Sequence, residues 1–213
     1  PEQATHVCFG ENEVINLFGL LQGEDLGGQW TETSATPSIG GAFQAGAGSF
    51  DVSSQQPAVY RFRYLLNSGG ACPSDDAFVE VEIEPLPIAQ AGTDRALDCV
   101  VTEVALDGSG SSTGTNIVYL WTTDEGHILS GANGLLPLVD ASGTYQLRVT
   151  NQTYGCFATD AVEVVANNIP PEAAQISAKD PLCHNQLNGS ISVVSVTGGS
   201  LQIGRASCRE RVS

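Results

Sequence analysis

Acidic side chains in predicted turns are the residues of this chain whose chemistry stands out first. Asp and Glu number 24 against 8 Lys and Arg, so the 213 residues carry a formal net charge of −16. Four of these residues are candidate metal ligands: Asp94 and Asp98 follow a predicted linker, and Asp124 and Glu125 lie in a predicted turn. Ca²⁺ takes about six to eight oxygen ligands, but no D-x-D-x-D-G loop is present. Structural calcium is therefore one hypothesis for these four acids, and a solvated acidic surface is the other.

The strongly acidic balance also restricts the partners. A surface of this sign repels phosphate backbones, so we expect no nucleic-acid partner. No apolar run approaches the length that spans a bilayer, and we expect no membrane insertion. The chain opens at Pro1 without an initiator Met, a charged leader or an apolar leader, so we expect it to be a piece of a longer protein.

Histidines could support acid–base or nucleophilic catalysis, but their placement here does not favour it. His6, His127 and His184 fall in three different repeat units at positions that do not match. Neither G-x-S-x-G nor H-E-x-x-H occurs in the chain. The sequence therefore predicts that the protein is not an enzyme and, calcium aside, that it uses no cofactor.

The cysteines point to disulfides instead of metal ligands. The chain has six of them, widely spaced and without a C-x-x-C pair. Disulfides persist outside the reducing cytosol, so this pattern predicts an extracellular or cell-surface location.

The cysteines also belong to an internal repeat, which organises the whole sequence. Positions that recur are Cys8 and Cys99, Trp30 and Trp121, Tyr60 and Tyr145, and Cys72 and Cys156. Each Trp follows the first Cys of its unit by 22 residues. Each second Cys is followed four residues later by a similar run, DAFVEV or DAVEV. The repeat has a period of roughly 85 to 90 residues, which indicates an array of one module.

The repeat predicts a disulfide within each module. Every module has one Cys near its start and one after its Tyr-containing strand, so we expect Cys8 to pair with Cys72 and Cys99 with Cys156. A bridge that closes a loop of this length stabilises by roughly 4 kcal/mol in the chain-entropy model. Cys183 would open a third module, and this reading leaves its partner undetermined.

Short alternating runs between Gly-, Ser-, Asn- and Asp-rich turns predict that these modules are all-β sandwiches. Residues 13–21 and 27–33 are expected strands of the first module. In residues 79–84 the apolar side chains of Val79, Val81 and Ile83 should face the core, while the intervening Glu80, Glu82 and Glu84 should face solvent.

Prolines mark the expected boundaries between modules. Residues 85–87 (PLP) and 167–172 (NNIPPE) read as stiff linkers. The predicted organisation is one sandwich over residues 1–86, a second over 87–168 and the start of a third repeat over 169–200. Residues 201–213 (LQIGRASCRERVS) break the pattern, resemble translated sequencing-adapter sequence and are expected to be non-native.

Several stretches resemble repeats of large secreted adhesins from gliding bacteria that use type IX secretion. LDGSGSS and DASGTYQLRVTN, followed by a GC pair, resemble immunoglobulin-like (Ig-like) repeats of the polycystic-kidney-disease (PKD) kind. INLFGLL, GGQW, VYRFRY and CPSDDAFVEV resemble another Ig-like repeat of such proteins. PLCHNQLNGSISVVSVTGGS resembles the opening of an SprB-type repeat. The resemblance implies tandem Ig-like β-sandwich modules, each with one disulfide.

An Ig-like sandwich gives structural roles to the recurring aromatic residues. Trp30 and Trp121 would pack in the core from strand C, although exposed sugar-stacking platforms remain the alternative. Tyr60 and Tyr145 would bond the backbone through their hydroxyl groups, as in a tyrosine corner.

The function expected from this reading is mechanical and adhesive. The segment would project and space the binding regions of a large secreted or cell-surface protein. Its partners would be further repeats of the same chain and a surface or glycan ligand that the sequence does not identify. Two alternatives stay open, namely an accessory module of a secreted polysaccharide- or protein-degrading enzyme, and a carbohydrate-binding module.

Overall fold

The computed structural model describes residues 3–21, 27–66, 75–167, 173–179 and 190–197. Those residues form 16 β-strands and a single turn of 3-10 helix, and they contain no α-helix. The predicted all-β class is therefore confirmed. Cys72, Cys183 and the tail over 201–213 lie outside the described residues.

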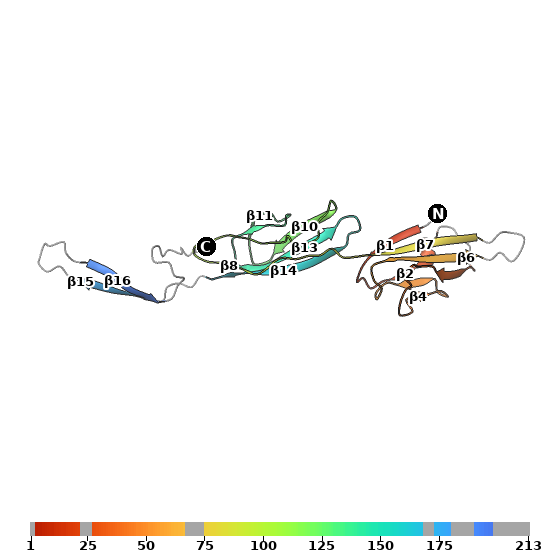
Figure 1. The fold of residues 1–213 in the computed structure, drawn as a ribbon, viewed down its shortest axis with the longest axis horizontal. Coiled ribbons are helices and arrows are strands. Elements are labelled where there is room, and N and C mark those ends of the chain that lie inside the picture. The colour runs from red at the N-terminus through yellow and green to blue at the C-terminus, as the bar shows by residue number, and fades with distance from the viewer. Residues whose placement is uncertain (1–2, 22–26, 67–74, 168–172, 180–189, 198–213) are drawn as a thin grey trace, which may run out of the picture. The chain divides into compact units, whose positions relative to one another are not determined.

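The first sandwich consists of two sheets that enclose an aromatic core. One sheet has the order β1 (Gln3–Cys8), β7 (Asp75–Glu84), β6 (Val59–Leu66) and β3 (Gln29–Glu32). The other has the order β2 (Val14–Asn16), β5 (Ser49–Asp51) and β4 (Phe43–Gln44). Figure 1 shows β1, β7 and β6 side by side, with β2 and β4 to one side of them.

Strict alternation places the side chains of the long strands. In β6 the buried residues are Tyr60, Phe62 and Tyr64, and in β7 they are Val79, Val81 and Ile83. These residues all belong to one hydrophobic cluster, as expected for one face of a strand. Glu84 differs from the expectation, because its residue is only 8% exposed although it lies on the outward face of β7.

The predicted strand over 13–21 ends early. Only Val14–Asn16 is extended, and a 3-10 helix, η1 (Leu17–Leu20), follows. Asn16 caps this turn, since its side-chain oxygen accepts a hydrogen bond from the Phe18 N–H at 3.1 Å. Asn favours such local bonds to the backbone over a continued ladder, and the turn carries Leu17 into the core.

The second sandwich repeats the plan with shorter strands in its second sheet. Its larger sheet has the order β10 (Ile117–Thr123), β13 (Gly143–Asn151), β14 (Phe157–Ala166) and β8 (Arg95–Leu97). Its smaller sheet has the order β11 (Ile128–Ser130), β12 (Leu138–Val139) and β9 (Val104–Ala105). Its buried residues include Leu97, Leu106, Trp121, Val139, Tyr145, Leu147, Val149, Val162 and Val164.

Both sandwiches carry a parallel strand at one edge of the larger sheet. β1 pairs with β7 in parallel, with His6 opposite Glu82 and Cys8 opposite Glu84. β8 pairs with β14 in parallel, with Leu97 opposite Ala166. The chain is thus a tandem of Ig-like β-sandwiches built on one topology.

Beyond the second sandwich, β15 (Ala173–Lys179) and β16 (Ser190–Thr197) form an antiparallel pair. The chain divides into two compact units. The first comprises Pro1–Gln90, Gly110–Leu120 and Leu147–Asp160, and the second comprises Ala91–Ser109, Trp121–Gln146 and Ala161–Ser213. The domain boundaries near residues 86 and 168 remain predictions.

Candidate functional site

A disulfide joins Cys8 to Cys156, with the two Cα atoms 5.5 Å apart. Cys8 is the last residue of β1, and Cys156 directly precedes β14. Both predicted pairings are therefore wrong, because Cys8 is not bonded to Cys72 and Cys156 is not bonded to Cys99. Cys99 is also disulfide-bonded, to a residue other than Cys156. The expectation of one bridge inside each module fails with them.

Strand direction explains why the predicted pairs cannot form. Because β1 runs parallel to β7, Cys8 lies opposite Glu84, the last residue of that strand. Position 72 precedes the first residue of the same strand, and the ten residues of β7 span about 30 Å. In the second sandwich Cys99 follows Leu97, which lies opposite Ala166, whereas Cys156 comes before the start of β14. A disulfide needs Cα atoms within about 7 Å, so Cys99 and Cys156 cannot pair; Cys8 is bonded to Cys156, and Cys72 lies outside the described residues.

The recurring aromatic residues lie in the two cores. Trp30 is 4% exposed and Trp121 is 2% exposed, so neither indole presents a face for a sugar to stack on. The indole N–H of Trp121 donates to the Gly134 carbonyl at 3.0 Å. The indole N–H of Trp30 has no hydrogen-bond partner among the described residues.

Both recurring tyrosines form tyrosine corners. The Tyr60 hydroxyl donates to the Gln56 carbonyl at 3.1 Å, and the Tyr145 hydroxyl lies 2.6 Å from the Ala141 carbonyl, four residues upstream in each case. Tyr145 also accepts a hydrogen bond from the His127 N–H at 2.9 Å. Burial is the largest cause that raises the pKa of Tyr60, and the Glu32 charge raises it further. These residues hold the fold and leave no reactive group free.

Three polar side chains converge on the outward face of the first sandwich. His6 extends from β1, and Glu82 and Glu84 extend from the paired strand β7. The Nδ1 atom of His6 lies 3.0 Å from a carboxylate oxygen of Glu84 and 3.4 Å from one of Glu82. One donor atom from each side chain falls within 4.8 Å of the others, a spacing that a metal ion could bridge.

Tyr154 completes the surroundings of this cluster. Its ring centroid is 4.7 Å from that of His6, with the planes tilted by 31°. The Glu84 charge is the largest cause that raises the pKa of Tyr154, and burial and the Glu82 charge raise it further. Tyr154 lies two residues before Cys156, so the aromatic ring and the disulfide reach β1 from the same segment. All these residues belong to the first compact unit.

Sequence reasoning missed this cluster for an identifiable reason. The alternation correctly placed Glu82 and Glu84 on the outward face of a strand, and His6 and Cys8 also lie two residues apart on β1. The parallel pairing of β1 with β7 brings the sets together, and nothing in the repeat specified that pairing. The signal available was the spacing of His6 and Cys8 on one strand face.

The four calcium candidates do not gather into one site. Asp94 accepts a hydrogen bond from the Glu163 N–H at 3.0 Å, and Asp98 accepts from the N–H groups of Val100 and Val101, each at 2.7 Å. Those two bonds to Asp98 are the largest causes that lower its pKa. Asp124 and Glu125 are exposed in a bend. Among the described residues, the His6 cluster is the one group with three suitable donor atoms.

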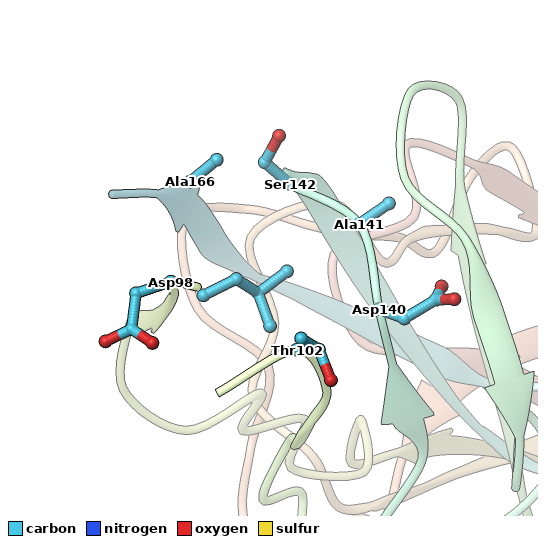
Figure 2. Close-up of a pocket in the computed structure, with 7 residues that line it drawn as sticks. Asp98, Thr102, Asp140, Ala141, Ser142 and Ala166 are labelled. Atoms are coloured by element: carbon cyan, nitrogen blue, oxygen red, sulfur yellow. The ribbon is translucent and has the colours of Figure 1, made fainter. Parts of the chain in front are cut away.

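A pocket of about 340 Å³ opens at one end of the second compact unit. The residues that line it are Leu97, Asp98, Thr102, Asp140, Ala141, Ser142 and Ala166. Figure 2 shows that the carboxylates of Asp98 and Asp140 point in different directions and do not converge. Asp140 instead faces the His127 Nδ1 atom at 2.7 Å. The pocket therefore offers neither a set of metal ligands nor an activated nucleophile.

No known protein-family model matches the chain, and no curated protein matches it. Similar solved structures include the I-band fragment I67–I69 from titin, at 11% identity over 91% of this chain and 74% of that one, with a TM-score of 0.40. Another is Sidekick-1 immunoglobulin domains 1–4, at 12% identity over 93% of this chain and 57% of that one, with a TM-score of 0.34.

The PKD domain from KIAA 1837 protein is also similar, at 27% identity over 38% of this chain and 85% of that one, with a TM-score of 0.32. With TM-scores of 0.40 or less, these similarities carry no argument about what the chain binds or does. Within the described part of the chain, no helix has the length and apolar character needed to cross a membrane.

Proposed function

We propose that this chain is a structural segment of a large secreted or cell-surface adhesin, which spaces and projects binding regions held elsewhere in the protein. Adhesins of gliding bacteria with type IX secretion, whose SprB-type repeats residues 181–200 resemble, are the proposed setting. The structural use of the recurring residues carries the proposal. Trp30 and Trp121 fill the cores, and Tyr60 and Tyr145 tie strands to the preceding turns.

The disulfide suits a segment that bears tension. Cys8 and Cys156 are 148 residues apart in sequence, so the bridge closes a loop that contains most of both sandwiches. A pull on the two ends of the chain would pass across this bridge and bypass the residues between them. The Cys8–Cys156 disulfide also supports the proposed extracellular setting, because disulfides persist outside the reducing cytosol.

Force spectroscopy on the full chain tests the proposal. A fully extended residue contributes roughly 3.3–3.6 Å, so the 148-residue loop hides about 500 Å of contour length. We expect the oxidised chain to lack this extension and the reduced chain to release it in steps, with refolding on relaxation. A reduced chain that extends at forces no higher than those of an unstructured control of equal length would contradict a load-bearing role.

The carbohydrate-binding alternative would need an exposed aromatic platform. Burial of Trp30 and Trp121 removes the two residues that the sequence offered for that purpose. Co-sedimentation of the full chain with insoluble polysaccharides should therefore leave the protein in the supernatant. Sedimentation that is lost when the second sandwich is mutated at its surface would favour the alternative instead.

A further inference from the structure

We propose that His6, Glu82 and Glu84 form a binding site for a divalent first-row transition-metal ion of the Zn²⁺ class. The three side chains offer one imidazole nitrogen and two carboxylate oxygens within 4.8 Å of one another. They extend from β1 and β7, whose parallel pairing holds His6 opposite Glu82. This inference does not depend on the proposed mechanical function.

The spacing of the donor atoms matches what a small ion requires. Zn²⁺ binds imidazole nitrogen and carboxylate oxygen at about 2.0–2.2 Å, so two ligands of a tetrahedral ion lie roughly 3.3–3.5 Å apart. The Nδ1 atom of His6 is 3.0 Å from Glu84 and 3.4 Å from Glu82. An ion can therefore enter among the three atoms with small side-chain rotations. Water would fill the fourth position, as at zinc sites with three protein ligands.

The chemistry of the donors selects the class of metal. Imidazole suits Zn²⁺, Cu²⁺ and Ni²⁺, whereas Ca²⁺ and Mg²⁺ prefer ligand sets made of oxygen. The cluster holds too few oxygen donors for a calcium cage, because Ca²⁺ takes about six to eight of them. The site is therefore distinct from the calcium hypothesis that concerned Asp94, Asp98, Asp124 and Glu125.

The burial of Glu84 is an observation that points to a ligand, because a simple ion pair with His6 could form on an exposed surface. The residue is 8% exposed on a strand face where alternation places solvent, while Glu82 next to it is half-buried. A buried carboxylate is costly unless a positive charge or hydrogen bonds compensate it. A divalent ion would compensate both carboxylates together and would use the lone pair of neutral imidazole. Tyr154, stacked beside His6, would limit the rotation of the ring.

Isothermal titration of the full, disulfide-bonded chain with ZnCl₂, after removal of metal by a chelator, tests the site. We expect one saturable site per chain that a large excess of Ca²⁺ does not block. His6→Asn and Glu84→Gln should each weaken Zn²⁺ binding by at least about tenfold, the lower range seen when the support of a metal site is removed. Glu80→Gln is the matched control, because Glu80 lies on the same face of β7 but pairs with Arg61.

A measurement on the unmodified chain covers the case in which a variant does not fold. In ¹⁵N NMR spectra, Zn²⁺ should shift the Nδ1 resonance of His6 and leave that of His127 unchanged, although His127 also faces a carboxylate. Absence of saturable binding would overturn the proposal. An unmoved His6 resonance at saturating Zn²⁺, or a loss in Glu80→Gln as large as that in Glu84→Gln, would do the same.

Discussion

The two sandwiches share one topology but fill it with different side chains. The first packs two groups of rings with neighbouring centroids 4.9 to 5.4 Å apart, one of Phe18, Trp30 and Tyr64 and the other of Phe43, Phe50, Tyr60 and Phe62. The second buries Trp121 and Tyr145 among aliphatic residues such as Leu106, Leu147 and Val149. Aromatic pairs contribute roughly 0.5–1.5 kcal/mol beyond the area they bury.

The polar groups of the equivalent Trp and Tyr residues, in contrast, form more hydrogen bonds in the second sandwich than in the first. Trp121 donates a hydrogen bond to Gly134, whereas Trp30 has no partner for its N–H among the described residues. The Tyr145 hydroxyl contacts the Ala141 carbonyl and both backbone groups of His127, whereas the Tyr60 hydroxyl bonds to the Gln56 carbonyl. Ring packing thus contributes more in the first sandwich, and side-chain hydrogen bonds contribute more in the second.

The largest effect on stability should come from loss of the Cys8–Cys156 disulfide, which links a strand of the first sandwich to the segment before β14 of the second. Replacing Cys8 and Cys156 by Ser opens a 148-residue loop, which the chain-entropy model values at about 5 kcal/mol. Guanidinium denaturation without reductant should show a clearly lower midpoint for the double variant than for the native chain. An unchanged midpoint would mean that each half is stable without regard to the bridge.

The cysteine pairing also marks where sequence reasoning fails. The repeat register placed Cys8 and Cys99 at equivalent positions, and the structure agrees, since Cys8 ends β1 and Cys99 follows β8. The pairing depended on whether each edge strand runs parallel or antiparallel to its neighbour, and alternating hydrophobicity is the same for both directions. The all-β class and the inward face of β7 needed only that alternation, and they agree with the structure.

The tryptophans allow a direct comparison of the two cores. Trp121→Ala and Trp30→Ala should each destabilise by roughly 3–5 kcal/mol, because each removes a large buried ring. Substitution by Phe should separate them, because Trp121→Phe removes the hydrogen bond to the Gly134 carbonyl, whereas the Trp30 N–H has no partner among the described residues. We expect Trp121→Phe to cost about 1–3 kcal/mol more than the loss of ring area alone. Thermal unfolding of the four variants measures this, and equal costs for the two Phe variants would remove the distinction.

The tyrosine corners provide a smaller version of the same comparison. Tyr145→Phe leaves the backbone groups of Ala141 and His127 without the hydroxyl, and it should cost about 2–3 kcal/mol. Tyr60→Phe removes one bond, to Gln56, and should cost about 1 kcal/mol. Urea denaturation can resolve the difference, and a larger effect for Tyr60 would reverse the assignment of hydrogen bonding to the second sandwich.

The cluster of His6, Glu82 and Glu84 could not be predicted from the sequence for a different physical reason. Glu84 was expected in solvent because alternation places it on the same face as Glu80 and Glu82, but it is only 8% exposed. Tyr154 is 70 residues from Glu84 in sequence, and yet it stacks on His6 and the Glu84 charge is the largest cause that raises its pKa. Alternation describes one strand and its two faces, so it cannot indicate what a distant segment brings against the outer face.

The smallest expected effect concerns an Asp–Ser turn that occurs in both sandwiches at different places, at the end of β5 in the first and after β9 in the second. Asp51 accepts hydrogen bonds from the N–H and the hydroxyl of Ser53, and Asp107 accepts the same pair from Ser109. The serine hydroxyl is the largest cause that lowers the pKa of each carboxyl group below 3.8, and the backbone bond lowers it further. Both carboxylates are exposed, so these bonds form in a solvent that screens charge.

Because each pKa is depressed in the folded state, the ionised form is the one that the fold favours. The resulting stability is present above the unfolded pKa near 3.8 and is lost as the pH falls through the lower, folded value. NMR titration should place the pKa values of both carboxyl groups below 3.8, while Ser53→Ala and Ser109→Ala should each raise only the neighbouring pKa. Since Arg95 adds an attraction at Asp107 alone, the pKa of Asp107 should keep part of its lowering after Ser109→Ala. A pKa at or above 3.8 for either carboxyl group would show that the hydrogen bonds of that turn do not favour the ionised form.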